Sequence, residues 1–240
     1  MKLTFLICDY VNDDLVPRHG TLADIFRRFA ADWPASEVRE FRVDLGEIPP
    51  LDYCSDGYLI SGSRHSVNDI QPWIKGLEQF LVEKLYQDGN SERFVGLCWG
   101  HQMLAKATGG LVERPQTLEE PNGVWHVGNH PVSVVSERQD TVPLPSSFSL
   151  LFNHREQVTK LGSQTQILAS AAGCPISMFS FQEKAIGLQA HPEYTRDYQE
   201  ALMEVVQGLS SEKRLDALKR NENYEPSAAI NAAIRDFLFK

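Results

Sequence analysis

The stretch "RFVGLCWGHQMLAKATGG", Arg93 to Gly110, decides the fold of this chain. A short apolar run ends at Cys98, and an amphipathic helical pattern begins at the next residue and stops at a pair of glycines. Such a pattern predicts a buried strand that passes directly into a helix. Cys98 stands at the junction, with Gly96 and Gly100 two residues away on either side.

The spacing around Cys98 is typical of a nucleophile that projects from a tight strand-to-helix turn. The glycines leave room for the backbone and for a substrate. The partial positive charge at a helix N-terminus favours thiolate over thiol, and free backbone N–H groups in the turn can bind an oxyanion. A buried structural cysteine in a glycine-rich turn explains these five residues equally well, so a partner base is needed to decide.

Strands alternate with helices over the first half of the chain, which predicts a mostly parallel central sheet flanked by helices. The expected strands before Cys98 are Lys2–Cys8, Glu37–Val43 and Asp56–Ser63, and the expected helices lie in "TLADIFRRFAADW" and "QPWIKGLEQFLVEKLYQDG".

The second half of the chain contains short strands without intervening helices, which predicts a small antiparallel addition to the sheet. These strands are Gly123–Val135, Leu150–Phe152, Ile167–Ala171, Ile176–Phe181 and Ala185–Ala190. The chain ends in two helices, "YQEALMEVVQGL" and "AAINAAIRDFLF", joined by a charged, polar connection that we interpret as a solvated face. We predict one α/β domain over residues 1–240, with a core of about 2–194 and C-terminal helices over 196–240.

The composition excludes several classes of protein. A formal net charge of −9 argues against a dedicated binder of nucleic acid or of anionic membranes. No apolar run approaches the ~20 residues of a membrane span, and the apolar run in "MKLTFLICDY" is too short for a secretory signal. Four well-separated cysteines without a C-x-x-C pair predict reduced thiols in a cytoplasmic protein, with Cys8 and Cys174 in the core.

The partner base is found in "AIGLQAHPEY", Ala185 to Tyr194, where an apolar strand runs into His191 and Glu193. Pro192 favours an extended conformation for the residue before it, and residues i and i+2 of an extended chain point to the same side. Glu193 can therefore orient the His191 imidazole while that ring draws a proton from Cys98. A surface histidine beside a capping glutamate is the alternative for these residues alone.

The segment "LISGSRHSV", Leu59 to Val67, supplies a third feature. A strand that ends in Ser-Gly-Ser forms a flexible turn whose backbone N–H groups can face an anion. An ordinary turn is the alternative. Arg64 and His65, which follow directly, are expected in the cleft beside Cys98, where they could contact the substrate; side chains that merely cover the cleft edge are the alternative.

Together, "GLCWGHQ", "SGS" and "HPE" resemble the class I (triad) glutamine amidotransferase family, in the same order along the chain. The segment "LFNHREQVTKLG" resembles the part of that family that lies beside the substrate. The resemblance extends from about Lys2 to Glu193 and includes stand-alone glutaminase and γ-glutamyl peptidase members and the amidotransferase domain of GMP synthase. It implies a flavodoxin-like α/β fold.

The resemblance assigns a role to individual residues. Cys98 would be the nucleophile, His191 the general base and acid, and Glu193 the residue that orients His191. The backbone N–H groups of Ser63 and Trp99 would form the oxyanion hole. The residues expected at the substrate are Gly62, Gln102, Asn153 and His154.

The implied reaction cleaves a γ-glutamyl amide, converting glutamine to glutamate and ammonia through a cysteine thioester. The partner would be glutamine or another γ-glutamyl small molecule, with a separate synthase subunit receiving the ammonia, and neither nucleic acid nor a membrane is expected. A γ-glutamyl peptidase acting on peptides or conjugates and a catalytically silent interaction protein are the alternatives.

The chain departs from the family pattern at two places. Ser63 stands where a second glycine is usual, which leaves the donor geometry of the oxyanion loop open. Asn153 and Glu156 replace a serine and an aspartate, which leaves substrate recognition open.

No cofactor and no metal site are predicted. His126 and His130 have the i, i+4 spacing of a helical metal pair, but "HVGNH" contains glycine and asparagine in a strand-like stretch, so the two rings would not share a helix face.

Overall fold

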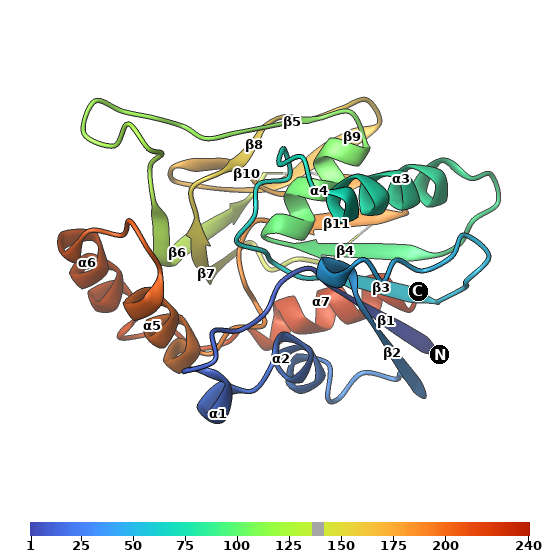
Figure 1. The fold of residues 1–240 in the computed structure, drawn as a ribbon, viewed down its shortest axis with the longest axis horizontal. Helices are drawn as coiled ribbons and strands as arrows, with labels where there is room; N and C mark the ends of the chain where they lie inside the picture. Colours follow the sequence, from blue (N-terminus) through green and yellow to red (C-terminus); the bar gives the residue numbers. More distant parts are fainter. Residues whose placement is uncertain (136–141) are drawn as a thin grey trace.

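A mixed nine-stranded sheet runs through the molecule in the order β2-β1-β3-β4-β11-β10-β9-β6-β7 (Figure 1). The computed structural model describes residues 1–135 and 142–240. Strands β2, β1, β3, β4 and β11 are parallel, and the four strands that follow are antiparallel. The bounds of the nine strands, in sheet order, are Glu37–Arg42, Lys2–Ile7, Gly57–Ile60, Arg93–Leu97, Ala185–Leu188, Cys174–Phe181, Thr165–Ala171, His126–Val134 and Ser147–His154.

Helices cover both faces of the parallel half of the sheet (Figure 1). Helices α3 and α4 pack over one face, α2 and α7 over the other, and α5 and α6 lie beside the antiparallel half. The helices are α1 (Val16–His19), α2 (Leu22–Phe29), α3 (Pro72–Tyr86), α4 (Trp99–Ala107), α5 (Arg196–Val205), α6 (Ser211–Asn221) and α7 (Ala228–Leu238), with a 3-10 turn η1 (Val43–Leu45). In the described part of the chain, no helix is long and apolar enough to cross a membrane.

The side chains of the parallel strands point alternately to the two faces of the sheet, and a hydrophobic core lies on each face. Phe5 packs with Phe26 and Phe237 on the side of α2 and α7. Tyr58 and Leu104 belong to the core under α3 and α4. The alternation of inward and outward residues explains why helices are required on both faces.

The predicted α/β architecture is confirmed, and the antiparallel addition consists of β10, β9, β6 and β7. A separate two-stranded sheet, β5 (Leu111–Glu113) with β8 (Gln157–Lys160), lies outside it. Cys8 and Cys174 are buried in the core as expected, and all four cysteines are free thiols.

The charged connection between the last two predicted helices forms a further helix, α6, over Ser211–Asn221; most of its residues are at least partly exposed, but the sequence did not indicate the helix. The Ser210 side chain caps this helix by accepting a hydrogen bond from the Lys213 N–H. Ala217 is fully buried against Gly128 of β6, whose φ of +88° no larger residue adopts readily. A single small residue on a charged helix therefore provides the packing face, which is too weak a signal for hydrophobic periodicity to detect.

Helix α4 crosses the parallel sheet at very short range because two glycines meet there. A Cβ atom on Gly96 would lie 2.3 Å from the backbone carbon and oxygen of Gly100. A Cβ atom on Gly100 would lie 2.6 Å from the Ile60 carbonyl oxygen. The two glycines on either side of Cys98 therefore allow the backbones of β3, β4 and α4 to pack directly against one another.

We expect Gly96→Ala to lower the free energy of unfolding by about 2–3 kcal/mol, because the new methyl group collides with the backbone of α4. Gly76→Ala is the matched control, since its methyl group meets only the end of the flexible Ile48 side chain on a helix that favours alanine, and it should change stability by less than about 1 kcal/mol. Urea unfolding measures both. Equal losses in the two variants would contradict the close crossing.

Candidate functional site

Cys98 occupies a strained backbone position between β4 and α4. Its φ of +51° and ψ of −101° are unusual for a residue with a side chain, and it is the N-cap of α4. Its backbone N–H donates to the Leu188 carbonyl of β11 at 2.8 Å. The glycine spacing predicts a tight strand-to-helix turn, or elbow, at this residue, and the structure has one there.

His191 and Glu193 follow the end of β11 and lie side by side, as the extended Pro192 segment predicts. His191 Nδ1 is 2.7 Å from Glu193 Oε1, and both side chains are almost fully buried. The Tyr194 ring stacks on the His191 ring with centroids 3.9 Å apart. The imidazole is therefore held by a carboxylate at one nitrogen and by an aromatic ring on one face.

The structure brings His191 and Cys98 together at Gly62. A Cβ atom on Gly62 would lie 3.0 Å from His191 Cε1 and 3.7 Å from Cys98 Cβ. Burial alone would lower the pKa of His191, but the neighbouring Glu193 carboxylate and the Cys98 thiol raise it to about 10. The favoured form of this ring at neutral pH is therefore the imidazolium.

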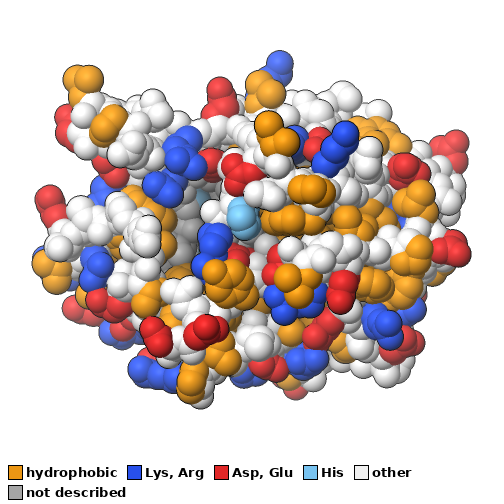
Figure 2. All heavy atoms as spheres, viewed as in Figure 1, with side chains coloured by type: hydrophobic (Ala, Val, Ile, Leu, Met, Phe, Trp, Pro, Cys, Tyr) orange, Lys and Arg blue, Asp and Glu red, His pale blue; other side chains and the backbone are white. Residues whose placement is uncertain are grey.

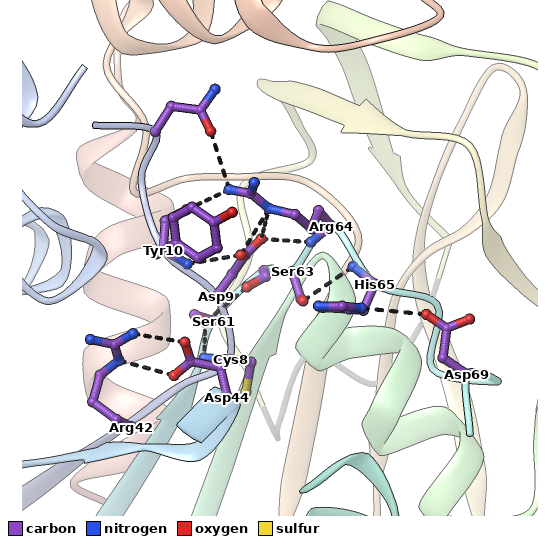
Figure 3. A network of polar contacts seen from close by, with 12 residues as sticks. Cys8, Asp9, Tyr10, Arg42, Asp44, Ser61, Ser63, Arg64, His65 and Asp69 are labelled. Atoms are coloured by element: carbon purple, nitrogen blue, oxygen red, sulfur yellow. Dashed lines mark hydrogen bonds and ion pairs between the residues drawn. The ribbon is translucent and has the colours of Figure 1, made fainter. Parts of the chain in front are cut away.

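The backbone of the Ser-Gly-Ser loop does not need a second glycine. Ser63 is not among the described residues with positive φ, so serine adopts this conformation without strain. Its side chain accepts a hydrogen bond from the His65 N–H at 3.3 Å, and the Ser61 hydroxyl accepts one from the Cys8 N–H at 2.9 Å (Figure 3). Among described residues, no protein acceptor binds the backbone N–H of Ser63 or of Trp99.

Arg64 fastens the same loop to the end of β1 (Figure 3). Asp9 accepts hydrogen bonds from the Arg64 backbone N–H at 2.7 Å and from its Nε at 3.1 Å. Arg64 Nη2 donates to the Tyr10 carbonyl at 2.8 Å, and the guanidinium lies 3.9 Å from the centre of the Tyr10 ring. Arg64 thus holds the loop that carries Ser63, and both of these polar contacts of its side chain are made within the protein, to Asp9 and Tyr10.

A pair of glutamine side chains lies behind Cys98. Gln189 Nε2 is 3.7 Å from Cys98 Sγ, and its Oε1 accepts a hydrogen bond from Gln102 Nε2 at 3.2 Å. Gln102 Nε2 also donates to the Glu156 carbonyl at 2.6 Å. The sequence analysis did not identify Gln189, although its position two residues before His191 in "LQAH" is the signal that would have found it.

The two remaining residues expected at the substrate lie on β7. His154 is buried, and both of its ring nitrogens have protein partners: the Glu156 carbonyl at 2.9 Å and His126 Nδ1 at 3.1 Å. Asn153 Oδ1 is buried without a hydrogen-bond partner among described residues. Asn153 therefore retains a free acceptor, whereas the His154 ring is used within the protein.

The surface view shows a hollow in this face of the molecule (Figure 2). It lies between the region of α5 and α6 and the body formed by the parallel strands with α3 and α4 (Figure 1). Charged side chains of both signs border it.

Comparison with known proteins identifies the family. The model of the family "Glutamine amidotransferase class-I" matches residues 35–204, well over half of the chain. The chain therefore belongs to the class I glutamine amidotransferase family. This confirms the resemblance inferred from "GLCWGHQ", "SGS" and "HPE".

The relatives include γ-glutamyl peptidases and GMP synthases. Gamma-glutamyl peptidase 4 of Arabidopsis thaliana is 30% identical over 162 residues, which cover 65% of this chain and 62% of that protein. A GMP synthase [glutamine-hydrolyzing] of Borreliella burgdorferi is 27% identical over 168 residues, covering 67% of this chain and 30% of the synthase. The match thus spans less than two thirds of the length of either relative.

The fold is shared with solved structures. The crystal structure of a glutamine amidotransferase from Thermotoga maritima superimposes with a TM-score of 0.71 at 21% identity, covering 99% of this chain and 98% of that chain. This likeness confirms the expected fold class.

Replacing Cys98 by glycine should stabilise the protein relative to replacing it by alanine. Both variants lack the thiol, but only glycine relieves the positive φ, and we expect a difference of about 1 kcal/mol in the free energy of unfolding. The same pair of changes at the exposed Cys54, which has no positive φ, should favour alanine instead. Chemical denaturation of the four variants checks the reversal, and its absence would contradict a strained elbow.

The protonation of His191 provides a second prediction. With its pKa raised to about 10, the ring should carry protons on both nitrogens at pH 8. Glu193→Gln removes the neighbouring negative charge and should leave the ring neutral at that pH. His126, whose pKa burial and the nearby His130 lower to about 3, is the internal control and should be neutral in both proteins. Long-range ¹⁵N–¹H spectra of histidine-labelled protein report each ring, and a neutral His191 in the wild type at pH 7 would refute this assignment.

Proposed function

We propose that this protein hydrolyses γ-glutamyl amide bonds, with Cys98 as the nucleophile, His191 as general base and acid, and Glu193 as the residue that orients His191. The observation that carries the proposal is the 2.7 Å bond between His191 and Glu193 with the His191 ring beside Cys98 at Gly62. Family membership and the presence of γ-glutamyl peptidases among the relatives support it.

The proposed reaction has two steps. The Cys98 thiolate attacks the γ-carbonyl carbon, and the tetrahedral oxyanion is bound by the free N–H groups of Ser63 and Trp99. His191 gives its proton to the leaving nitrogen, so the C–N bond breaks and a γ-glutamyl thioester remains. A water molecule, deprotonated by His191, then attacks the thioester and releases glutamate with the thiolate restored.

The substrate would be recognised by the polar groups around the elbow. Gly62 provides the space beside Cys98, and the unpartnered Oδ1 of Asn153 is the acceptor that we assign to the substrate ammonium group, which would require the Asn153 side chain to turn toward the ligand. Gln102 and His154 would act through the arrangement of the loops they bond to, since their side chains have protein partners. Glutamine and γ-glutamyl peptides both contain the bond in question, and the relatives include proteins named for each.

We expect the product to distinguish a glutaminase from a γ-glutamyl peptidase. The purified chain is incubated with glutamine, with a γ-glutamyl dipeptide and with the α-glutamyl isomer of that dipeptide, and ammonia and free amino acid are measured. Ammonia from glutamine indicates an amidotransferase subunit that supplies a synthase, and amino-acid release from the γ-linked dipeptide alone indicates a peptidase. Cleavage of the α-linked isomer at an equal rate would contradict γ-glutamyl specificity.

Cys98→Ala should reduce kcat on the better substrate by about 10³-fold or more, because the covalent intermediate cannot form. Cys54→Ser, at an exposed cysteine far from the elbow in sequence, is the control and should retain wild-type rates. Unchanged hydrolysis in Cys98→Ala would sink the proposal. No hydrolysis of any γ-glutamyl compound by the wild type would favour the catalytically silent alternative.

A further inference from the structure

Two histidines and a cysteine outside the elbow converge in the antiparallel half of the sheet. The ladder of β6 with β7 places His126 directly opposite His154. Strand β9 ends at Ala171, which pairs with Val132, and in the turn that follows a Cβ atom on Gly173 would lie 3.9 Å from His126 Nε2 at the start of β6. That turn carries Cys174 to the two rings.

The donor atoms are close enough to share one ion. One ring nitrogen of each histidine and Cys174 Sγ all lie within 4.8 Å of one another. His126 Nδ1 and His154 Nε2 are 3.1 Å apart. Two nitrogens bound to a tetrahedral zinc ion at ~2.0–2.1 Å are about 3.3 Å apart, so the imidazole pair already has this separation. Zinc binding would draw Cys174 Sγ closer to the two nitrogens.

The hydrogen bonds around the cluster orient the rings as ligands. His154 Nδ1 donates to the Glu156 carbonyl at 2.9 Å, which leaves the lone pair of Nε2 directed at His126. A carbonyl that fixes the second nitrogen is the usual support of a metal-binding histidine. His126 Nε2 is buried and has no hydrogen-bond partner among the described residues, so the bond between the two rings leaves one nitrogen unsatisfied.

We propose that His126, His154 and Cys174 bind one zinc(II) ion, with a solvent molecule as the fourth ligand. Two imidazoles and a thiolate match the ligand preference of zinc. On binding, the Cys174 thiol releases its proton to solvent. The proton of His126 Nδ1 moves to Nε2, the nitrogen without a partner, so one proton leaves per metal bound.

The sequence offered a different pair, His126 with His130, and that pair was rejected because both residues lie in a strand-like stretch. His126 and His130 were compared as a helical pair, and they indeed share a strand, with ring centroids 4.1 Å apart. The partners that complete the donor set come from other strands. The zinc would tie β7 to the start of β10, across the two strands that separate them in the sheet.

Cobalt(II) titration of the metal-free full chain tests the proposal, because a thiolate-to-cobalt charge-transfer band reports binding through cysteine. Wild type should bind one equivalent, which zinc(II) then displaces. Cys174→Ser should lose the band, and His126→Gln should weaken binding by more than the about 10–100-fold typical of an outer-shell change. Cys54→Ser should bind like the wild type.

Cys98→Ala distinguishes the proposed site from the elbow, where a cysteine and a histidine also meet. Retention of the band in this variant supports the cluster, and its loss would assign the metal to Cys98 and overturn the proposal. Far-UV circular dichroism shows whether Cys174→Ser folds. If Cys174→Ser does not fold, His126→Gln decides, because His126 is partly exposed and its replacement disturbs the core less. Cobalt(II) affinity equal to that of the wild type in His126→Gln would overturn the proposal. None of these readouts depends on catalysis, so they leave the proposed hydrolysis untouched.

Discussion

The contact on which the site depends is the crossing of α4 over the parallel strands without side chains between the two backbones. Gly96 meets Gly100, and Gly100 meets the Ile60 carbonyl, so the helix must begin immediately after β4. This leaves one residue for the turn, and that residue is forced to a positive φ. The strain falls on Cys98, which thereby projects from the end of the strand instead of packing beneath it. The position of the thiol is thus a consequence of backbone packing.

The loops at the ends of the neighbouring parallel strands place further polar groups around the Cys98 thiol. Strand β3 ends in the Ser-Gly-Ser loop, and β11 ends in the segment of Gln189 and His191, on either side of β4. Since parallel strands end at one edge of a sheet, three loops distant in sequence meet there without further constraint. Arg64 and Asp9 then fix the first loop to β1, so four consecutive strands define the geometry around the sulfur.

Features that depend on residues close together in the sequence could be predicted, and features that depend on residues far apart in the sequence could not. The strand–helix alternation, the elbow and the pairing of His191 with Glu193 depend on residues within a few positions of each other, and each left a readable pattern. Helix α6 was not recognised because only Ala217 and Asn221 are buried on it. The cluster of His126, His154 and Cys174 depends on strand register, which no local pattern specifies.

The antiparallel half of the sheet bears on the elbow through β7. The His191 backbone N–H donates to the Leu151 carbonyl at 2.8 Å, so the strand that precedes His154 also fixes the proposed general base. Gln199 of α5 donates to the next carbonyl, that of Phe152, at 2.9 Å and holds the same strand from outside. His154 lies three residues beyond Leu151 on a continuous ladder with β6. A ligand that fixes His154 therefore restrains the strand on which the position of His191 relies, which connects the histidine–cysteine cluster physically to the nucleophile although the two share no side chain.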